Sequence, residues 1–411
     1  MKDNTVLSRV ERHVIKNTNC YFLMLLDFCK QSKNLYNHAN YIVRQELINN
    51  KKWIRYNELN NILKNDSEFP DYYNLPTVQA SQQTLRLLDK NWKSFFKSIK
   101  DWKKNPNKYL GMPKQPGYKN KNGYFELILT NQNCRLKNGV VYFPKCFNNF
   151  CISTNIEENT GFRSFQQVRL IPHSKRITIE IVYTISKQDA LENNGRYIGI
   201  DIGVDNLATV ANTCNIKSFI INGKPIKSIN QFYNKKLSHY KSICERMNRT
   251  KTTNRIKSLT TKRNEKIDDY LHKASKYIIE FCSKNNINTI IIGKNNEWKQ
   301  NSNMSKRVNQ NFVQIPFARF INMIQYKAEN IGITVILTEE SYTSSTSFID
   351  NELPCKEYYR KTRRIHRGLF KSNNNTYINA DLNGAYQIIK KVVSIKWDRG
   401  CALHPFVVNM V

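Results

Sequence analysis

The strongest indication of the fold is the stretch Tyr197-Ile-Gly-Ile-Asp201-Ile-Gly-Val-Asp205-Asn-Leu-Ala-Thr-Val210. Its β-branched residues and glycines predict a buried strand with Asp201 between the two glycines. A carboxylate in a buried strand costs roughly several kcal/mol of folding free energy unless it is paired or bound to a metal. Asp201 is therefore the first candidate functional residue.

Downstream of this stretch, the pattern changes to alternating strands and helices. The residues up to about 222 predict two more short strands, and a long pair of helices follows. Strands at 289–293 and 334–337 flank another helix, and a last helix begins near residue 380. Three adjacent strands followed by alternating helices and strands is the element order of an RNase H-like α/β domain.

Upstream, residues 1–25 and roughly 125–190 are rich in predicted strand. The block between them has apolar residues at a helical period, as at Leu85, Leu88 and Trp92. It ends in a basic linker, residues 103–119, whose three prolines and two glycines exclude a long helix. The simplest interpretation is a helical insert inside a β module.

The charge of the chain indicates the class of its partners. The 411 residues suggest two or three domains, and 65 Lys and Arg against 32 Asp and Glu give a formal charge of +33. Nucleic acid is the first expected partner, and an anionic membrane surface is the weaker alternative. No stretch approaches the ~18 apolar residues of a membrane span. Ten cysteines form no Cys-x-x-Cys pair, which predicts reduced thiols in a cytosolic protein.

A second candidate carboxylate is Asp381, in Asn379-Ala-Asp381-Leu-Asn-Gly-Ala385 at the start of the final helix. One interpretation is that Asp381 is the N-cap of this helix. The other is a metal ligand facing Asp201. Two Mg²⁺ ions in one nuclease site need about three carboxylates that converge from different elements.

These motifs resemble TnpB, the family of transposon-encoded RNA-guided nucleases related to type V CRISPR effectors. Residues 199–210 are similar to its first RuvC motif, and residues 379–385 to its third. The segment Glu340-Ser-Tyr-Thr-Ser344 resembles the entry to its zinc ribbon, and residues 75–96 resemble its helical recognition segment. The resemblance spans the chain from about residue 20 to 395.

The resemblance implies a RuvC nuclease domain of RNase H-like fold at 194–411, with a helical hairpin at 230–285. Before it, a β-barrel wedge domain (1–25 and 121–193) would carry a helical recognition insert with the basic linker (26–120). The implied activity is that of a transposon-encoded endonuclease that cuts double-stranded DNA beside a short motif, with a guide RNA from the element end. The implied protein is cytoplasmic and nucleoid-associated, binds no membrane, and works as a monomer or dimer on one RNA.

Magnesium is the implied cofactor, and the acid of the second motif is the open question. TnpB proteins usually place this acid at the end of the strand matching 289–293, where this chain has Gly293 and Lys294. A glutamate on the neighbouring strand, about 4.8 Å away, can reach across a glycine. We expect Asp201, Glu340 and Asp381 to hold Mg²⁺. Glu339 is the alternative because adjacent residues point to opposite faces, and Glu297 is expected to be a solvated loop residue.

The second departure from TnpB is the zinc ribbon, because residues 343–377 contain a single cysteine, Cys355. No tetrahedral zinc site can form from this loop alone, so we expect no zinc. The loop is basic and is either an exposed charged segment or a lid that grips nucleic acid. The expected nucleic-acid contacts in this loop and in the hairpin are Arg246, Arg249, Arg255, Arg363, Arg364 and Arg367.

Two alternative functions stay open at this level. One is an RNA-guided DNA-binding repressor with an inactive nuclease site, which the missing second-motif acid favours. The presence of both Asp201 and Asp381 argues against it. The other is an RNase H-fold transposase that acts on DNA ends without RNA, and the N-terminal likeness to a guide-binding module argues against that.

Overall fold

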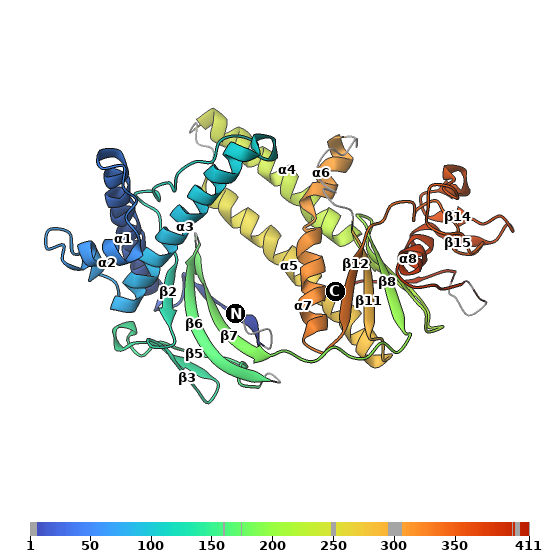
Figure 1. Ribbon diagram of the computed structural model, residues 1–411, viewed down its shortest axis with the longest axis horizontal. Helices are drawn as coiled ribbons and strands as arrows, with labels where there is room; N and C mark the ends of the chain where they lie inside the picture. Colours follow the sequence, from blue (N-terminus) through green and yellow to red (C-terminus); the bar gives the residue numbers. More distant parts are fainter. Residues whose placement is uncertain are drawn as a thin grey trace. The chain divides into compact units, whose positions relative to one another are not determined.

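The computed structural model describes residues 6–158, 161–173, 175–247, 252–294, 306–396, 398 and 403–410. The chain divides into two compact units, Met1–Lys187 and Gln188–Val411 (Figure 1). Within the described ranges, no helix is both long and apolar enough to cross a membrane.

The second unit is built on a six-stranded sheet that contains Asp201 in a central strand. The order across the sheet is β12-β11-β8-β9-β10-β16. Strands β8, β11 and β12 are parallel, whereas β9 runs antiparallel to β8 and to β10. The strands are β8 (Tyr197–Ile202), β9 (Asn206–Asn212), β10 (Phe219–Asn222), β11 (Thr289–Gly293), β12 (Thr334–Thr338) and β16 (Phe406–Val408).

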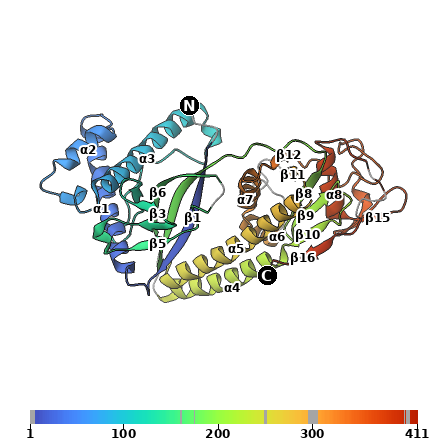
Figure 2. The same ribbon diagram turned by 90° about the horizontal axis from the view of Figure 1, so that it is seen from below.

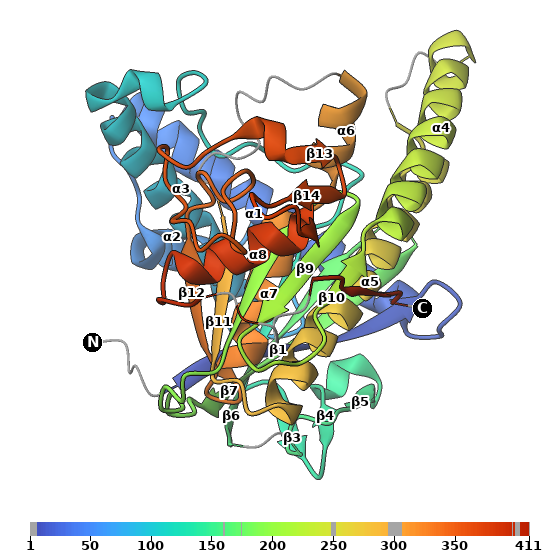
Figure 3. The same ribbon diagram turned by 90° about the vertical axis from the view of Figure 1, so that its right-hand side faces the viewer.

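Helices cover both faces of this sheet. Alternate residues of β11 point to opposite faces, so Ile290 and Ile292 join one core and Ile291 joins the other. The first core includes α5 and α7, and the second includes α8, which lies across β8 and β9 (Figure 3). The helices are α4 (Lys224–Met247), α5 (Asn254–Lys284), α6 (Lys306–Gln314), α7 (Phe317–Glu329) and α8 (Ala380–Lys390). Helices α4 and α5 form a long antiparallel pair (Figure 2).

The segment between β12 and α8 forms a small three-stranded sheet. Its strands are β13 (Arg364–His366), β14 (Leu369–Lys371) and β15 (Tyr377–Asn379), joined in antiparallel order, with the short turn of helix η4 (Lys361–Arg363) before them. Phe370 and Phe348 of this segment are fully buried in the core under α8, where the Phe348 ring stacks on Tyr386 at 4.4 Å.

The first unit contains two antiparallel sheets, two long helices (α1 and α3) and the short helix α2 around one core. The four-stranded sheet has the order β1-β7-β6-β2, and the three-stranded sheet has the order β3-β4-β5. Its elements are β1 (Val6–Lys16), α1 (Phe22–Asn49), α2 (Tyr56–Lys64), η1 (Pro70–Tyr72), α3 (Val78–Lys104), η2 (Pro106–Lys108), β2 (Leu127–Thr130), β3 (Arg135–Lys137), β4 (Val140–Tyr142), η3 (Lys145–Phe147), β5 (Cys151–Ser153), β6 (Phe162–Pro172) and β7 (Arg176–Ser186).

The observed elements agree with the expected RNase H-like order in the second unit: three adjacent strands, then alternating helices and strands. In the first unit, helices α1 to α3 lie between β1 and β2 in the sequence, as the apolar periodicity predicts. One local expectation is wrong. Residues 22–25 were expected in a strand-rich region but begin α1, because Phe22, Leu25 and Cys29 recur at helical spacing and are buried on one face.

Candidate active site

Asp201 lies near the end of β8, directly under helix α8. The close approach of the two elements depends on glycine at position 199. A Cβ atom there would lie 2.3 Å from the carbonyl oxygen of Ala385 and 2.5 Å from Cγ1 of Ile389. A Cβ on Gly384 would in turn lie 3.0 Å from Oδ2 of Asp201. The two glycines therefore let α8 rest on the strand that carries the carboxylate.

Asp381 is not the N-cap of α8, so that interpretation of the sequence is wrong. Asn379 is the N-cap, and its Oδ1 accepts hydrogen bonds from the backbone N–H groups of Asp381 (3.1 Å) and Leu382 (3.0 Å). The Asp381 carboxylate is thereby left to interact elsewhere. Asn206 of β9 donates to its Oδ2 at 2.7 Å, and Arg364 of β13 donates to its Oδ1 at 3.0 Å.

Glu340, two residues beyond the end of β12, occupies the space above Gly293 of β11. A Cβ atom on Gly293 would lie 2.5 Å from Cγ and 2.6 Å from Oε1 of Glu340. Glu339 is exposed, whereas Glu340 is partly buried. The structure thus brings Glu340, and not its neighbour, to the glycine at which the resemblance to TnpB implies an acid. Its role as a metal ligand stays a prediction.

The three carboxylates interact electrostatically in this structure. The pKa of Asp201 is raised well above its ordinary value, first by burial and then by the negative charges of Glu340 and Asp381, against the opposing charge of Arg364. Burial also raises the pKa of Glu340 to about 7, and the Lys391 ammonium opposes this shift. Asp201, Glu340 and Asp381 come from β8, the loop after β12 and α8, so the fold brings three carboxyl groups to one partly buried place.

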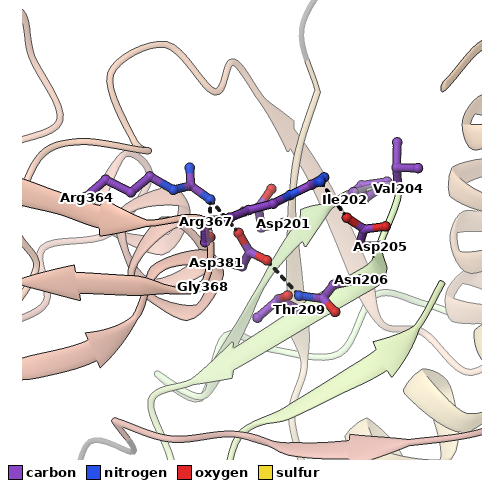
Figure 4. Close-up of a pocket in the computed structure, with 11 residues that line it drawn as sticks. Asp201, Ile202, Val204, Asp205, Asn206, Thr209, Arg364, Arg367, Gly368 and Asp381 are labelled. Atoms are coloured by element: carbon purple, nitrogen blue, oxygen red, sulfur yellow. Dashed lines mark hydrogen bonds and ion pairs between the residues drawn. The ribbon is translucent and has the colours of Figure 1, made fainter. Parts of the chain in front are cut away.

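A pocket of about 360 Å³ opens beside Asp201 and Asp381 (Figure 4). Arg367 of the β13–β14 hairpin reaches Asp205 at its rim, with Nη1 2.7 Å from Oδ2, and Lys227 of α4 contacts the same carboxylate. The pocket combines carboxylates on one side with guanidinium groups on the other. Its lining residues are Asp201, Ile202, Gly203, Val204, Asp205, Asn206, Thr209, Arg364, Arg367, Gly368 and Asp381.

The donor set suits a hard divalent cation, because carboxylate oxygens are the ligands that Mg²⁺ prefers. A cation would also offset the repulsion that acts on Asp201. As the side chains stand, however, no three Asp, Glu, His or Cys residues in the described part of the chain are arranged to hold a metal ion. Both oxygens of Asp381 already have partners, Arg364 and Asn206. The carboxylates are therefore suitable ligands for a metal ion. In this structure, however, Arg364 is bonded to Asp381, one of the expected ligands.

Arg363 is a buried structural residue, which corrects its expected role as a nucleic-acid contact. Its guanidinium is 9% exposed and lies 2.5 Å from Oε2 of Glu352 and 3.9 Å from Oδ2 of Asp350. Glu352 also accepts a hydrogen bond from the backbone N–H of Ser347 at 2.8 Å. The buried ion pair, together with Phe348 and Phe370, orders the segment that lacks the zinc-ribbon cysteines.

Two further arginines of the sequence analysis, Arg246 and Arg255, lie on the α4–α5 pair. Arg246 is exposed and bonds to Ser242 of its own helix, and Arg255 is exposed with its guanidinium 4.7 Å from the centre of the Tyr240 ring. Arg249 and Glu297 lie outside the described residues. Nucleic-acid contact by Arg246 and Arg255 stays a prediction.

Two family models match consecutive parts of the chain. The family OrfB_IS605, described as a probable transposase, matches residues 180–299, and the TNB domain of Cas12f1-like proteins matches residues 317–388. Asp201 falls in the first match, and Glu340 and Asp381 fall in the second. Together these matches support a TnpB/Cas12f-like family for this chain, so the resemblance that the sequence motifs indicate is confirmed.

A curated relative is the CRISPR-associated endodeoxyribonuclease Cas12f2 of Micrarchaeota archaeon (strain CG1_02_47_40), 26% identical over 289 residues. The alignment covers 64% of this chain and 48% of the relative, so it spans about half the length of that protein. Two solved structures are similar over most of the chain. They are a Cas12f1–sgRNA–target DNA complex (TM-score 0.36, 14% identity, 92% of this chain and 98% of that one) and a CRISPR-Cas12f ternary complex (TM-score 0.35, 16% identity, 89% and 80%).

The sequence analysis missed two pocket residues, Asn206 and Asp205. Both follow Asp201 within the motif, and the tight β8–β9 turn places them beside it because Asp201 pairs with Thr209 across the two strands. The sequence does contain a signal for these two residues: they form a polar pair shortly after a buried strand that is followed by glycine. It also missed Lys391, whose Nζ donates to Ser341 Oγ at 2.9 Å next to Glu340.

Proposed function

We propose that this chain is a transposon-encoded, RNA-guided DNA endonuclease that cuts double-stranded DNA beside a short motif, with a guide RNA from the element end. The observation that carries the proposal is the convergence of Asp201, Glu340 and Asp381, from β8, the loop after β12 and α8, at one partly buried place. The matches of residues 180–299 and 317–388 to transposase and Cas12f1-like family models support the choice of nucleic acid as substrate.

In this proposal Asp201, Glu340 and Asp381 hold Mg²⁺. The bound metal supplies polarisation of the scissile phosphate and a hydroxide nucleophile near neutral pH. Asn206 orients Asp381 through its 2.7 Å hydrogen bond, and the glycines at 199 and 384 keep α8 close enough for Asp381 to face Asp201. The role of the protein is to fix the oxygen donors from separate rigid elements.

The pocket beside the carboxylates would receive the DNA backbone. Arg367 is 75% exposed at its rim, so its guanidinium can exchange Asp205 for a phosphate without desolvation of a buried charge. Gly368 adds no side chain to this wall, and a Cβ atom there would have no neighbour within 4 Å. The pocket is therefore accessible to an extended phosphodiester strand.

The other assignments complete the proposal. The first unit would be the wedge domain with a helical recognition insert, and it would hold the guide RNA, as monomer or dimer. The formal charge of +33 is consistent with a protein that neutralises many phosphates. Base pairing of the guide would then select the target.

A first experiment asks whether RNA is a partner. The chain, purified without added nuclease, is expected to retain a discrete RNA whose release depends strongly on salt. The RNA is sequenced and used to reconstitute cleavage of matching double-stranded DNA with Mg²⁺. A chain that carries no RNA and cuts DNA ends unaided would support the RNase H-fold transposase and contradict the proposal.

A second experiment tests the site. Glu340→Gln keeps the size of the side chain but removes the charge, so cleavage is expected to fall at least ~10²-fold while guide and target binding persist. Asp201→Asn and Asp381→Asn should behave alike. Glu339→Gln is the matched control, because Glu339 is exposed, and it should reduce the cleavage rate far less. If the wild-type chain binds its target but never cuts, the repressor function replaces this one.

A further inference from the structure

The β13–β14 hairpin carries a cation into the proposed metal site. Nη2 of Arg364 lies 3.0 Å from Oδ1 of Asp381, and the same nitrogen donates to the backbone carbonyl of Arg367 at 2.9 Å. With Asn206 on the other oxygen, the Asp381 carboxylate has no oxygen without a partner. We infer that Arg364 competes with the metal ion for Asp381, so that metal loading requires Arg364 to leave; this inference rests on the proposed function.

The electrostatics of the cluster support the competition. The negative charges of Glu340 and Asp381 both act on Asp201, and Arg364 is the cation that opposes them there. A guanidinium and a divalent cation at Asp381 would thus each compensate the negative charge of the same carboxylates. They cannot do so together without repelling one another at close range.

The exchange requires a side-chain movement and no rearrangement of the fold. The hairpin backbone is tied to α8, since the N–H of Ala380 donates to the carbonyl of Gly368 at 3.2 Å. The Arg364 side chain is 31% exposed and lines the open pocket, so it can turn away from Asp381 toward solvent. The energetic cost of release is modest, because both side chains of the ion pair are partly exposed and water can replace the partner.

Released Arg364 would remain at the pocket wall beside Arg367. A phosphodiester in the pocket offers it a second anion, and a guanidinium binds phosphate oxygens in a forked geometry. Arg364 would therefore pass from Asp381 to the DNA backbone as the metal takes its place. Without metal and DNA, the ion pair keeps the carboxylate occupied.

The test is a titration of the metal-free, full-length chain with Mn²⁺ as the probe, followed by calorimetry. Arg364→Gln removes the competitor, so its Mn²⁺ affinity is expected to rise about threefold to tenfold. Arg367→Gln is the matched control: it removes the same charge from the same hairpin but from a residue paired with Asp205, and should change the affinity by at most about twofold. Equal tightening in both variants, or none in Arg364→Gln, would overturn the inference.

Cleavage provides an independent readout. Arg364→Gln should bind Mn²⁺ more tightly yet cut DNA more slowly, because the phosphate contact is lost, and a merely structural role would not give these opposite signs. If Arg364→Gln does not fold, Arg364→Met replaces it; methionine also removes the charge and should tighten Mn²⁺ binding by the same factor. An Arg364→Met affinity equal to that of the wild type would then overturn the inference.

The failure of this inference can be told apart from the failure of the proposed function. Asp201→Asn should abolish high-affinity Mn²⁺ binding to the chain. If it does, but Arg364→Gln does not tighten binding, only the competition is wrong. If Asp201→Asn leaves Mn²⁺ binding unchanged, the metal does not bind at the cluster, and the proposed function and the inference fail together.

Discussion

Gly293→Ala is the most direct test of whether the position of Glu340 matters. The added Cβ atom would lie 2.5 Å from Cγ of Glu340 and 2.6 Å from Cδ1 of Ile388. To regain an ordinary contact of 3.4 Å, the glutamate must retreat by about 0.9 Å. The substitution changes no charge and no hydrogen-bonding group, so its effect on activity comes from this displacement.

The expected size follows from the geometry. Displacement of a catalytic group by about 1 Å can reduce a rate ~10²-fold, so Mg²⁺-dependent cleavage by Gly293→Ala should fall by about that factor. The same crowding of Glu340 and Ile388 should lower the free energy of unfolding by about 1–3 kcal/mol. Both quantities are measurable on one preparation, by single-turnover cleavage with guide and target and by urea unfolding.

Two further variants make the result specific. Gly111→Ala is the control, because a Cβ atom at this position of the first unit meets nothing within 4 Å. Gly293→Glu combined with Glu340→Ala moves the acid to the strand end that related sequences use. This double variant should cut at least ~10-fold faster than Glu340→Ala alone, because it restores a carboxylate to the cluster.

One result would refute the reasoning. If Gly293→Ala is folded at the assay temperature and cuts within about threefold of the wild type, the location of the Glu340 carboxylate does not limit the reaction. Glu340 would then be a structural neighbour of the site, and a different acid would complete it.

Two other predictions concern pH and the buried ion pair. Because the pKa of Glu340 is raised from 4.5 to about 7 in the fold, the unfolded chain loses this proton first, and the free energy of unfolding of the metal-free chain should fall as pH rises from about 4.5 to 7. Glu340→Gln should remove about 3 kcal/mol of that fall in urea unfolding curves, and an identical pH dependence in the two proteins would contradict the assignment. Arg363→Met leaves Glu352 and Asp350 buried without their cation, so it should cost about 3–5 kcal/mol, whereas the exposed control Arg360→Met should cost less than about 0.5 kcal/mol. If Arg363→Met unfolds at the same urea concentration as the wild type, the ion pair does not order the segment.

The local sequence pattern was sufficient to predict the helices and strands and to single out Asp201 and Asp381 as candidate residues. The alternation of β-branched residues and glycine around Asp201 specifies a strand that is buried on both faces, and helical periodicity specifies α1, α3 and α8, because both patterns depend on residues close in sequence. For Glu340, the resemblance to TnpB is also needed: it implies an acid at position 293, where this chain has glycine and an acid beyond the next strand. The structure brings Glu340 to that glycine, and its role as a metal ligand stays a prediction. The parallel strands β11 and β12 are neighbours at a fixed spacing. A long side chain that follows β12 can therefore fill the space left by a glycine at the end of β11.

The pairing of charges was decided only by the tertiary structure. Arg363 and Arg364 are neighbours in a basic run, yet one is buried against Glu352 and the other reaches Asp381. Nothing in the run distinguishes them, since which face of the segment meets α8 depends on contacts made by distant residues. The cap of α8 is a similar case, because Asn379 and Asp381 both suit that position and only the backbone geometry assigns it to Asn379.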